Sequence, residues 1–167
     1  MSSIRTLLFL LFLLDPGYSG FSNLASADSL LIKLAMKSRT VGQKDDLLMT
    51  LTIKSQQHPS FYLPDTDQWG FIGDPVAFYL IQLQKKAGDK YVNIKLPGHL
   101  DNIPNFRLDT VGPNQERRLD FALYILQSYI KGEYRVRVLC KLSLYNHLKD
   151  RYSNWTYFTC IKDINPF

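Results

Sequence analysis

The sequence has few of the residues from which catalytic and metal sites are usually built. It contains two cysteines and three histidines, and the histidines (His58, His99 and His147) are far apart along the chain. It has no HExxH or Cys-x-x-Cys motif, no glycine-rich phosphate loop and no Gly-x-Ser-x-Gly. No set of nucleophile, base and orienting residue can be assembled from it. We therefore expect no catalytic residues, no metal and no cofactor.

Dense basic patches are also missing, although the formal net charge is +5. The only adjacent basic pairs are Lys85-Lys86 and Arg117-Arg118. A surface that binds nucleic acid has a denser cluster of positive charge, so we do not expect a nucleic-acid partner. Mild attraction to anionic polysaccharide or lipid headgroups is compatible with this charge.

The apolar run near the start of the chain is too short to cross a membrane. Residues 7–14 are less than half of the roughly 20 apolar residues that a spanning helix needs. The run follows Arg5 and precedes small residues that end at Ala25-Ser26-Ala27, an order typical of a secretory signal peptide. We expect residues 1–27 to be a signal peptide and residues 28–167 to form one secreted or periplasmic domain without a transmembrane span. The alternative is a buried N-terminal strand or helix.

Helical periodicity is poor, and short stretches of alternating apolar and polar residues dominate the rest of the chain. About seven or eight such strands, separated by turns, predict an all-β protein, an antiparallel β-sandwich rather than an α/β fold. Residues 119–130 could instead form a helix. The extended stretches are residues 30–36, 47–54, 61–63, 76–84, 91–96, 106–108, 117–126, 134–142 and 155–161, of which 61–63 and 106–108 are only three residues long.

Both cysteines lie in the last two expected strands. Pairing these strands about Asp150 places Cys140 opposite Cys160, with both side chains on the apolar face. In an exported protein, opposed cysteines on neighbouring strands form a disulfide, so we predict the bond Cys140–Cys160. The alternative is two buried free thiols.

The same register predicts an aromatic and basic surface on the outer face of this hairpin. Its residues are Tyr145, Trp155 and Tyr157, with Arg135 and Arg137 nearby. Such groups bind proteins, peptides and sugars. The alternative is a cross-strand pair of Tyr145 and Trp155 that is covered by Lys and Arg stems. Trp69 lies in an irregular segment, residues 65–75, and is either part of a recognition loop or a plug that caps the core.

Residues 126–138, LQSYIKGEYRVRV, resemble the corner before the sixth strand of immunoglobulin-like and fibronectin type III-like sandwich domains. In those domains a Gly-x-Tyr enters an alternating strand, and the tyrosine hydroxyl caps nearby backbone. The resemblance implies an immunoglobulin-like fold in which Gly132 and Tyr134 are structural. The chain departs from the family in two ways: position 136 is not cysteine, and residues 76–84 contain no tryptophan.

These features favour a non-catalytic binding or interaction module of the cell envelope, whose partner is a protein or a polysaccharide. Two alternatives are a small secreted enzyme with a carboxylate-based hydrolase site near Asp65 and Asp67, and an extracellular protease inhibitor that presents residues 65–75. Asn154-Trp155-Thr156 is an N-glycosylation sequon, which we expect not to be used.

Overall fold

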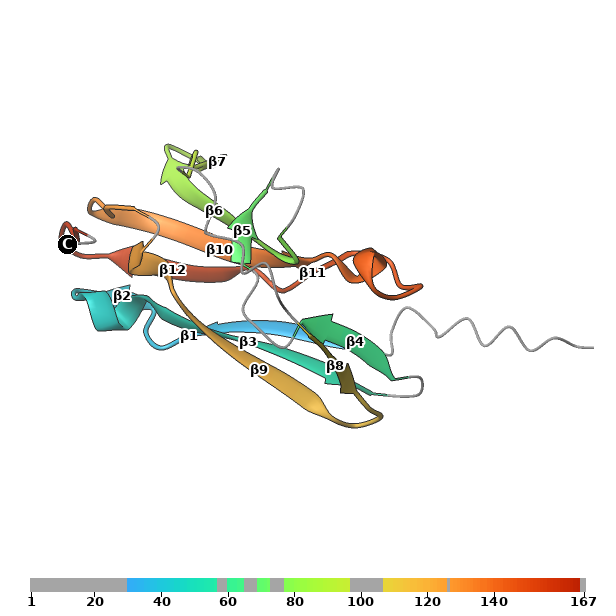
Figure 1. Ribbon diagram of the computed structural model, residues 1–167. Helices are drawn as coiled ribbons and strands as arrows, with labels where there is room; N and C mark the ends of the chain where they lie inside the picture. The colour runs from blue at the N-terminus through green and yellow to red at the C-terminus, as the bar shows by residue number, and fades with distance from the viewer. Residues whose placement is uncertain are drawn as a thin grey trace, which may run out of the picture.

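The computed structural model describes residues 30–56, 60–64, 69–72, 77–96, 107–125 and 127–165. The expected signal peptide at residues 1–27 lies outside the described residues, as do Asp65 and Asp67. Within the described ranges the regular elements are strands and three short 3-10 helices, η2 (Lys44–Leu47), η3 (Leu123–Ile125) and η4 (Leu142–Leu144). The strands form two stacked layers (Figure 1). The prediction of an all-β fold is confirmed.

The smaller layer contains a three-stranded antiparallel sheet in the order β1-β3-β9. A separate antiparallel pair, β4 with β8, contributes Phe61, Leu63 and Val111 to the same core. These strands span Leu30–Met36 (β1), Leu48–Ser55 (β3), Phe61–Pro64 (β4), Leu108–Val111 (β8) and Glu116–Ala122 (β9).

The larger layer has the order β2-β12-β10-β6-β5, with β7 on β6 and β11 on β10. Two of its pairs, β2 with β12 and β5 with β6, are parallel. The expectation of a wholly antiparallel sandwich is therefore wrong in detail, since this sheet is mixed. Its strands span Thr40–Val41 (β2), Trp69–Phe71 (β5), Tyr79–Ala87 (β6), Lys90–Asn93 (β7), Gly132–Cys140 (β10), Arg151–Tyr152 (β11) and Thr156–Cys160 (β12).

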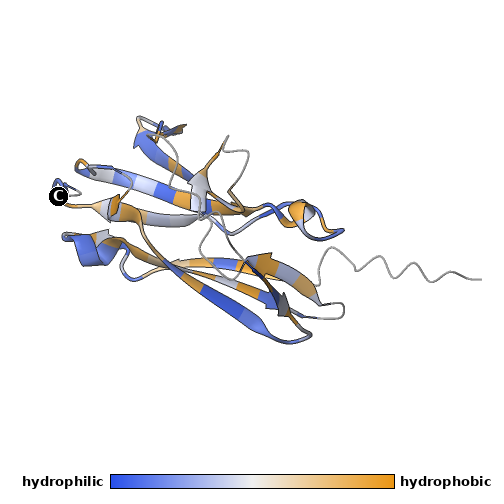
Figure 2. Cartoon of the chain, viewed as in Figure 1, coloured by the Kyte–Doolittle hydropathy of each residue, from blue (hydrophilic) through white to orange (hydrophobic). Residues whose placement is uncertain are grey.

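The core between the layers is built from alternate residues of the strands. In β3, Met49, Leu51 and Ile53 are at most 1% exposed, and in β10, Val136 and Val138 are fully buried. Hydrophobic and hydrophilic residues alternate along strands of both layers (Figure 2). Full burial of one such side chain is worth about 1.5–3 kcal/mol, so this pattern explains why the two layers pack. The inward faces expected for these two strands are confirmed.

Two tyrosine hydroxyls cap backbone carbonyl groups at and before the start of β10. The Tyr134 hydroxyl donates a hydrogen bond to the Ile130 carbonyl oxygen at 2.7 Å, and the Tyr129 hydroxyl donates to the Leu123 carbonyl oxygen at 2.8 Å. Gly132, between them, has a φ of 150°, a backbone conformation that favours glycine. The contact of Tyr134 is the one that the resemblance implied. Burial raises the pKa of Tyr134 to about 12 and raises the pKa of Tyr129 as well.

The predicted disulfide Cys140–Cys160 is wrong, because the register of the two strands differs from the expected one. Cys160 lies opposite Gly132, and Cys140 lies opposite Tyr79 of β6. Eight residues of β10 separate Gly132 from Cys140, a distance of roughly 26 Å, whereas a disulfide requires Cα atoms within about 7 Å. Both thiols are buried and free. Burial raises the pKa of Cys160 to about 11 and also raises the pKa of Cys140.

The reason for this register is the connection between β10 and β12. Instead of turning back as a simple hairpin about Asp150, the chain forms η4 and then β11, which pairs with the end of β10. Leu142, expected in the strand, lies in η4. The helix considered for residues 119–130 is also not formed: β9 continues to Ala122 and only one 3-10 turn follows.

Two asparagine side chains form hydrogen bonds with backbone groups at the outer edges of strands in the smaller layer. Asn154 Oδ1 accepts from the Leu34 backbone nitrogen at 2.8 Å, and Asn154 Nδ2 donates to the Leu34 carbonyl oxygen at 3.0 Å. Asn146 makes the same pair of bonds to the backbone of Tyr62 at 2.7 and 2.9 Å. Each side-chain amide therefore takes the place of a neighbouring strand, at β1 and at β4, and leaves fewer backbone groups open for pairing with another chain.

Candidate binding surface

On the outer face of the larger sheet, two arginines alternate with three aromatic rings. The Cζ atom of Arg135 lies 4.3 Å from the ring centroid of Tyr91 and 4.2 Å from that of Trp155. The Cζ atom of Arg137 lies 4.4 Å from the ring centroid of Trp155 and 3.6 Å from that of Tyr152. We call these five residues the Arg–aromatic ladder. A cation–π contact of this kind contributes about 0.5–1 kcal/mol at an exposed site, so four of them restrain both guanidinium groups.

Side-chain amides of β6 and β7 fix the arginines further. Arg135 Nε donates to Gln84 Oε1 at 2.6 Å, and Arg137 Nε donates to Gln82 Oε1 at 2.7 Å. The Nε2 atoms of Gln84 and Gln82 in turn donate to Asn93 Oδ1, at 2.7 and 3.1 Å. Each guanidinium group is thus held by one hydrogen bond and two rings, and its terminal Nη groups are the donors that remain for a partner.

The strand pairing explains why these residues meet. Arg135 and Arg137 of β10 lie opposite Gln84 and Gln82 of β6. Side chains at alternate positions of a strand share a face, so all four side chains lie on the same side of the sheet. On the other side of β10, Tyr157 of β12 lies opposite Arg135. The ladder therefore crosses β7, β10, β11 and Trp155, the residue before β12, on one face.

Four of the six predicted binding residues lie on this face: Arg135, Arg137, Trp155 and Tyr157. The Tyr157 side chain is 50% exposed, and its ring lies 6.0 Å from that of Tyr91. An ion pair between Lys86 and Glu133, at 2.8 Å, lies beside them on β6 and β10. A hydrogen bond from Lys86 to Glu133 raises the pKa of that lysine.

The other two predicted binding residues, Tyr145 and Trp69, are placed elsewhere. Tyr145 stacks on Phe78 with a centroid distance of 5.8 Å and packs against the core, so its predicted place beside Trp155 is wrong. The cause is the register, which moves Tyr145 into the turn after η4. Trp69 is 5% exposed and packs 4.7 Å from Phe121, between the layers. It is a core residue, as the alternative interpretation had it, and not part of a recognition surface.

Two rings of the ladder, Tyr91 and Tyr152, and the three side-chain amides that support its arginines are not identified from the sequence. Tyr91 lies in an expected strand, but its contact with the hairpin depends on the pairing of β6 with β10, which the sequence alone does not specify. Tyr152 lies outside the expected strands, whereas in the structure it is part of β11. The alternating Gln82 and Gln84 opposite Arg135 and Arg137 would have been a signal, had the partner of β10 been known.

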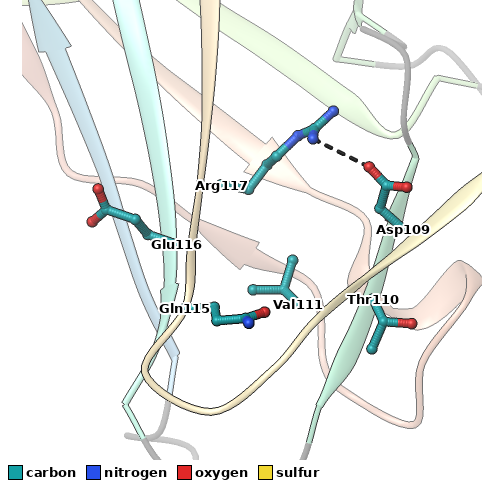
Figure 3. Close-up of a pocket in the computed structure, with 6 residues that line it drawn as sticks. All are labelled: Asp109, Thr110, Val111, Gln115, Glu116 and Arg117. Atoms are coloured by element: carbon teal, nitrogen blue, oxygen red, sulfur yellow. Dashed lines mark ion pairs between the residues drawn. The ribbon is translucent and has the colours of Figure 1, made fainter.

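A pocket of about 320 Å³ lies at the turn between β8 and β9. In Figure 3, Arg117 and Asp109 face each other across it and form an ion pair at 3.1 Å. Glu116 points away from this pair and instead binds Arg118 at 2.7 Å. Both carboxylates that line the pocket, those of Asp109 and Glu116, are thus paired with an arginine.

No group of three or more His, Cys, Asp or Glu residues that could hold a metal ion is found among the described residues. The candidate carboxylates Asp65 and Asp67 lie outside those residues, as do His58 and His99. In the part of the chain that the structure describes, no helix is both long enough and apolar enough to cross a membrane.

Comparison with protein-family models, with curated proteins and with solved structures found no match to this chain.

Proposed function

We propose that this chain is a non-catalytic binding module of the cell envelope, secreted or periplasmic, and that it binds a protein partner through the Arg–aromatic ladder and Tyr157. The proposal includes an immunoglobulin-like sandwich fold and no nucleic-acid partner. Export is supported by the sequence of residues 1–27 alone, since these residues lie outside the described part of the structure.

The strand order supports the immunoglobulin-like fold. One layer has the order β1-β3-β9, and the other contains β12-β10-β6 with β7 beside β6. In an immunoglobulin-like domain, strands A, B and E occupy one sheet, and strands G, F, C and C′ occupy the other in corresponding order. The hydrogen bond from the Tyr134 hydroxyl to the Ile130 carbonyl oxygen matches the tyrosine corner of such domains.

The observation that carries the binding function is the ladder. Trp, Tyr and Arg are the residues that dominate the energy of protein–protein interfaces. Here they gather on one sheet face, and rings and amides already hold the two arginines in one conformation. A surface that is ordered before binding loses less conformational entropy on association, which favours affinity.

Site-specific photo-crosslinking tests this function. Tyr157 and Tyr62 are matched in exposure, at 50% and 48%, but lie in different layers. We expect benzoylphenylalanine at position 157, in the native host, to give a discrete cross-linked partner. The same group at position 62 should give none. The change Trp155→Ala, made together with the photo-crosslinker at position 157, should remove the adduct.

The opposite pattern would overturn the proposal. Equal adducts from positions 157 and 62, or adducts from position 62 alone, would show that this sheet face is not the binding surface. Circular dichroism and thermal unfolding of each variant would establish that it is folded before its adducts are compared.

A further inference from the structure

The two arginines of the ladder have no carboxylate partner among the described residues. Other cations of the chain do: Lys86 pairs with Glu133, Arg117 with Asp109, and Arg118 with Glu116. The polar partners of Arg135 and Arg137 are instead the neutral side chains of Gln84 and Gln82. Two positive charges are thus held on one face without neutralisation, which favours an anionic partner.

The geometry of these arginines suits carboxylates at a defined spacing. A guanidinium group presents its terminal N–H groups as a planar fork that matches a carboxylate. Arg135 and Arg137 are alternate residues of β10, which places their Cα atoms about 7 Å apart. Alternate side chains of an extended peptide have this same spacing. A partner segment with acidic residues at alternate positions can therefore meet both forks at once.

The rings of the ladder are poorly suited to a sugar. Binding of a sugar by an aromatic residue requires an open ring face, but Trp155 already contacts two guanidinium groups. Tyr91 and Tyr152 each contact one. What the surface offers is the hydrogen-bond donors of two arginines set between aromatic rings, and Arg, Tyr and Trp are residues that are enriched in protein–protein interfaces.

We propose that the ladder binds an extended acidic segment of a partner protein, with Asp or Glu at alternate positions paired to Arg135 and Arg137. This proposal rests on the proposed function and names the chemistry of its partner.

Two labelled peptides test the proposal on the unaltered protein. The first probe is fluorescein-labelled ETETETETE, and the second is QTQTQTQTQ, which has the same length and shape without charge. We expect fluorescence anisotropy at low salt to show saturable binding of the first peptide and at least tenfold weaker binding of the second. Affinity for the first should fall as salt is added, because both partners are charged.

A matched pair of double variants locates the site. R135Q/R137Q removes two positive charges from the ladder. K33Q/R118Q removes two from the outer face of the other layer, where Lys33 and Arg118 both lie opposite Thr52 of β3. We expect at least a tenfold loss of affinity for ETETETETE in the first variant and less than a threefold loss in the second. R135K/R137K, which keeps the charge but not the fork, should lie between them.

Three outcomes would overturn the proposal. Equal losses in the two double variants would mean attraction to the net charge of the protein. Equal affinity for the two peptides would exclude recognition of carboxylates. Binding of heparin, but not of ETETETETE, in a manner that requires Arg135 and Arg137 would assign the surface to an anionic polysaccharide. If the photo-crosslinker at position 157 still captures a partner while ETETETETE fails to bind, the proposed function stands and only the acidic segment is wrong.

Discussion

The change Asn154→Ala removes the side chain that closes the outer edge of β1. Its two hydrogen bonds to β1 are lost, from the Leu34 backbone nitrogen to Asn154 Oδ1 at 2.8 Å and from Asn154 Nδ2 to the Leu34 carbonyl oxygen at 3.0 Å. The carbonyl keeps a second donor, since Thr156 Oγ1 lies 2.9 Å from it, whereas the nitrogen loses its side-chain acceptor. At about 0.5–1.5 kcal/mol for each bond, the expected loss in free energy of unfolding is about 2 kcal/mol.

Urea unfolding followed by circular dichroism measures this loss. Asn154→Asp keeps an acceptor for the Leu34 nitrogen but places a carboxylate oxygen against the Leu34 carbonyl, so we expect it to be destabilised as well. Asn165→Ala, at an exposed position near the C-terminal end of the described chain, is the control and should change stability by less than about 0.5 kcal/mol. A loss at Asn154→Ala no larger than at Asn165→Ala, with unchanged dependence on urea, would refute the reasoning.

The remaining predictions concern the tyrosine corner and the thiols. Tyr134→Phe removes the hydrogen bond to Ile130 and should lower stability by about 1 kcal/mol in urea unfolding at neutral pH. Because burial raises the pKa of Tyr134 to about 12, the native state holds this proton more tightly than the unfolded chain does. The contribution of this hydroxyl to the free energy of unfolding should therefore be fully present below pH 10 and be lost as the pH rises toward 12. Over this range the stability of Tyr134→Phe should fall less steeply than that of the unaltered protein, and equal slopes in the two proteins would contradict the assignment. Without any reductant, iodoacetamide should leave Cys140 and Cys160 unmodified in the native protein and label both in urea, whereas a mass with no adduct in urea would indicate a disulfide.

The sequence predicts which face of each strand is buried far better than which residues lie opposite one another. The alternation along β10 and β12 places Cys140 and Cys160 on the inner face, as expected. The partner of Cys160, however, is Gly132 and not Cys140. The difference is eight residues, an even number, and a shift by an even number keeps every side chain on its face. Hydrophobic alternation therefore cannot distinguish the two registers, and the length of the connection through η4 and β11 decides between them.

Part of the candidate site was predictable for the same reason. Arg135, Arg137 and Tyr157 face outward in either register, so the alternation alone is enough to place them on the surface. Tyr145 was misplaced because its position depended on the register. Tyr91 lies in a strand that returns from β6 in a tight, local hairpin. Its contact with Arg135 also requires the pairing of β6 with β10, a long-range pairing that no local pattern specifies.

Residues 154–157 connect the stability of the domain with its candidate binding surface. Asn154 and Thr156 face the smaller layer and bind the backbone of Leu34, while Trp155 and Tyr157 face outward and join the ladder and its rim. Because the segment is extended, fixing the inward residues also fixes the position of the outward ones. The contact between the two layers therefore holds Trp155 in place between the guanidinium groups. The order of this candidate binding surface therefore follows from the packing of the two layers beneath it.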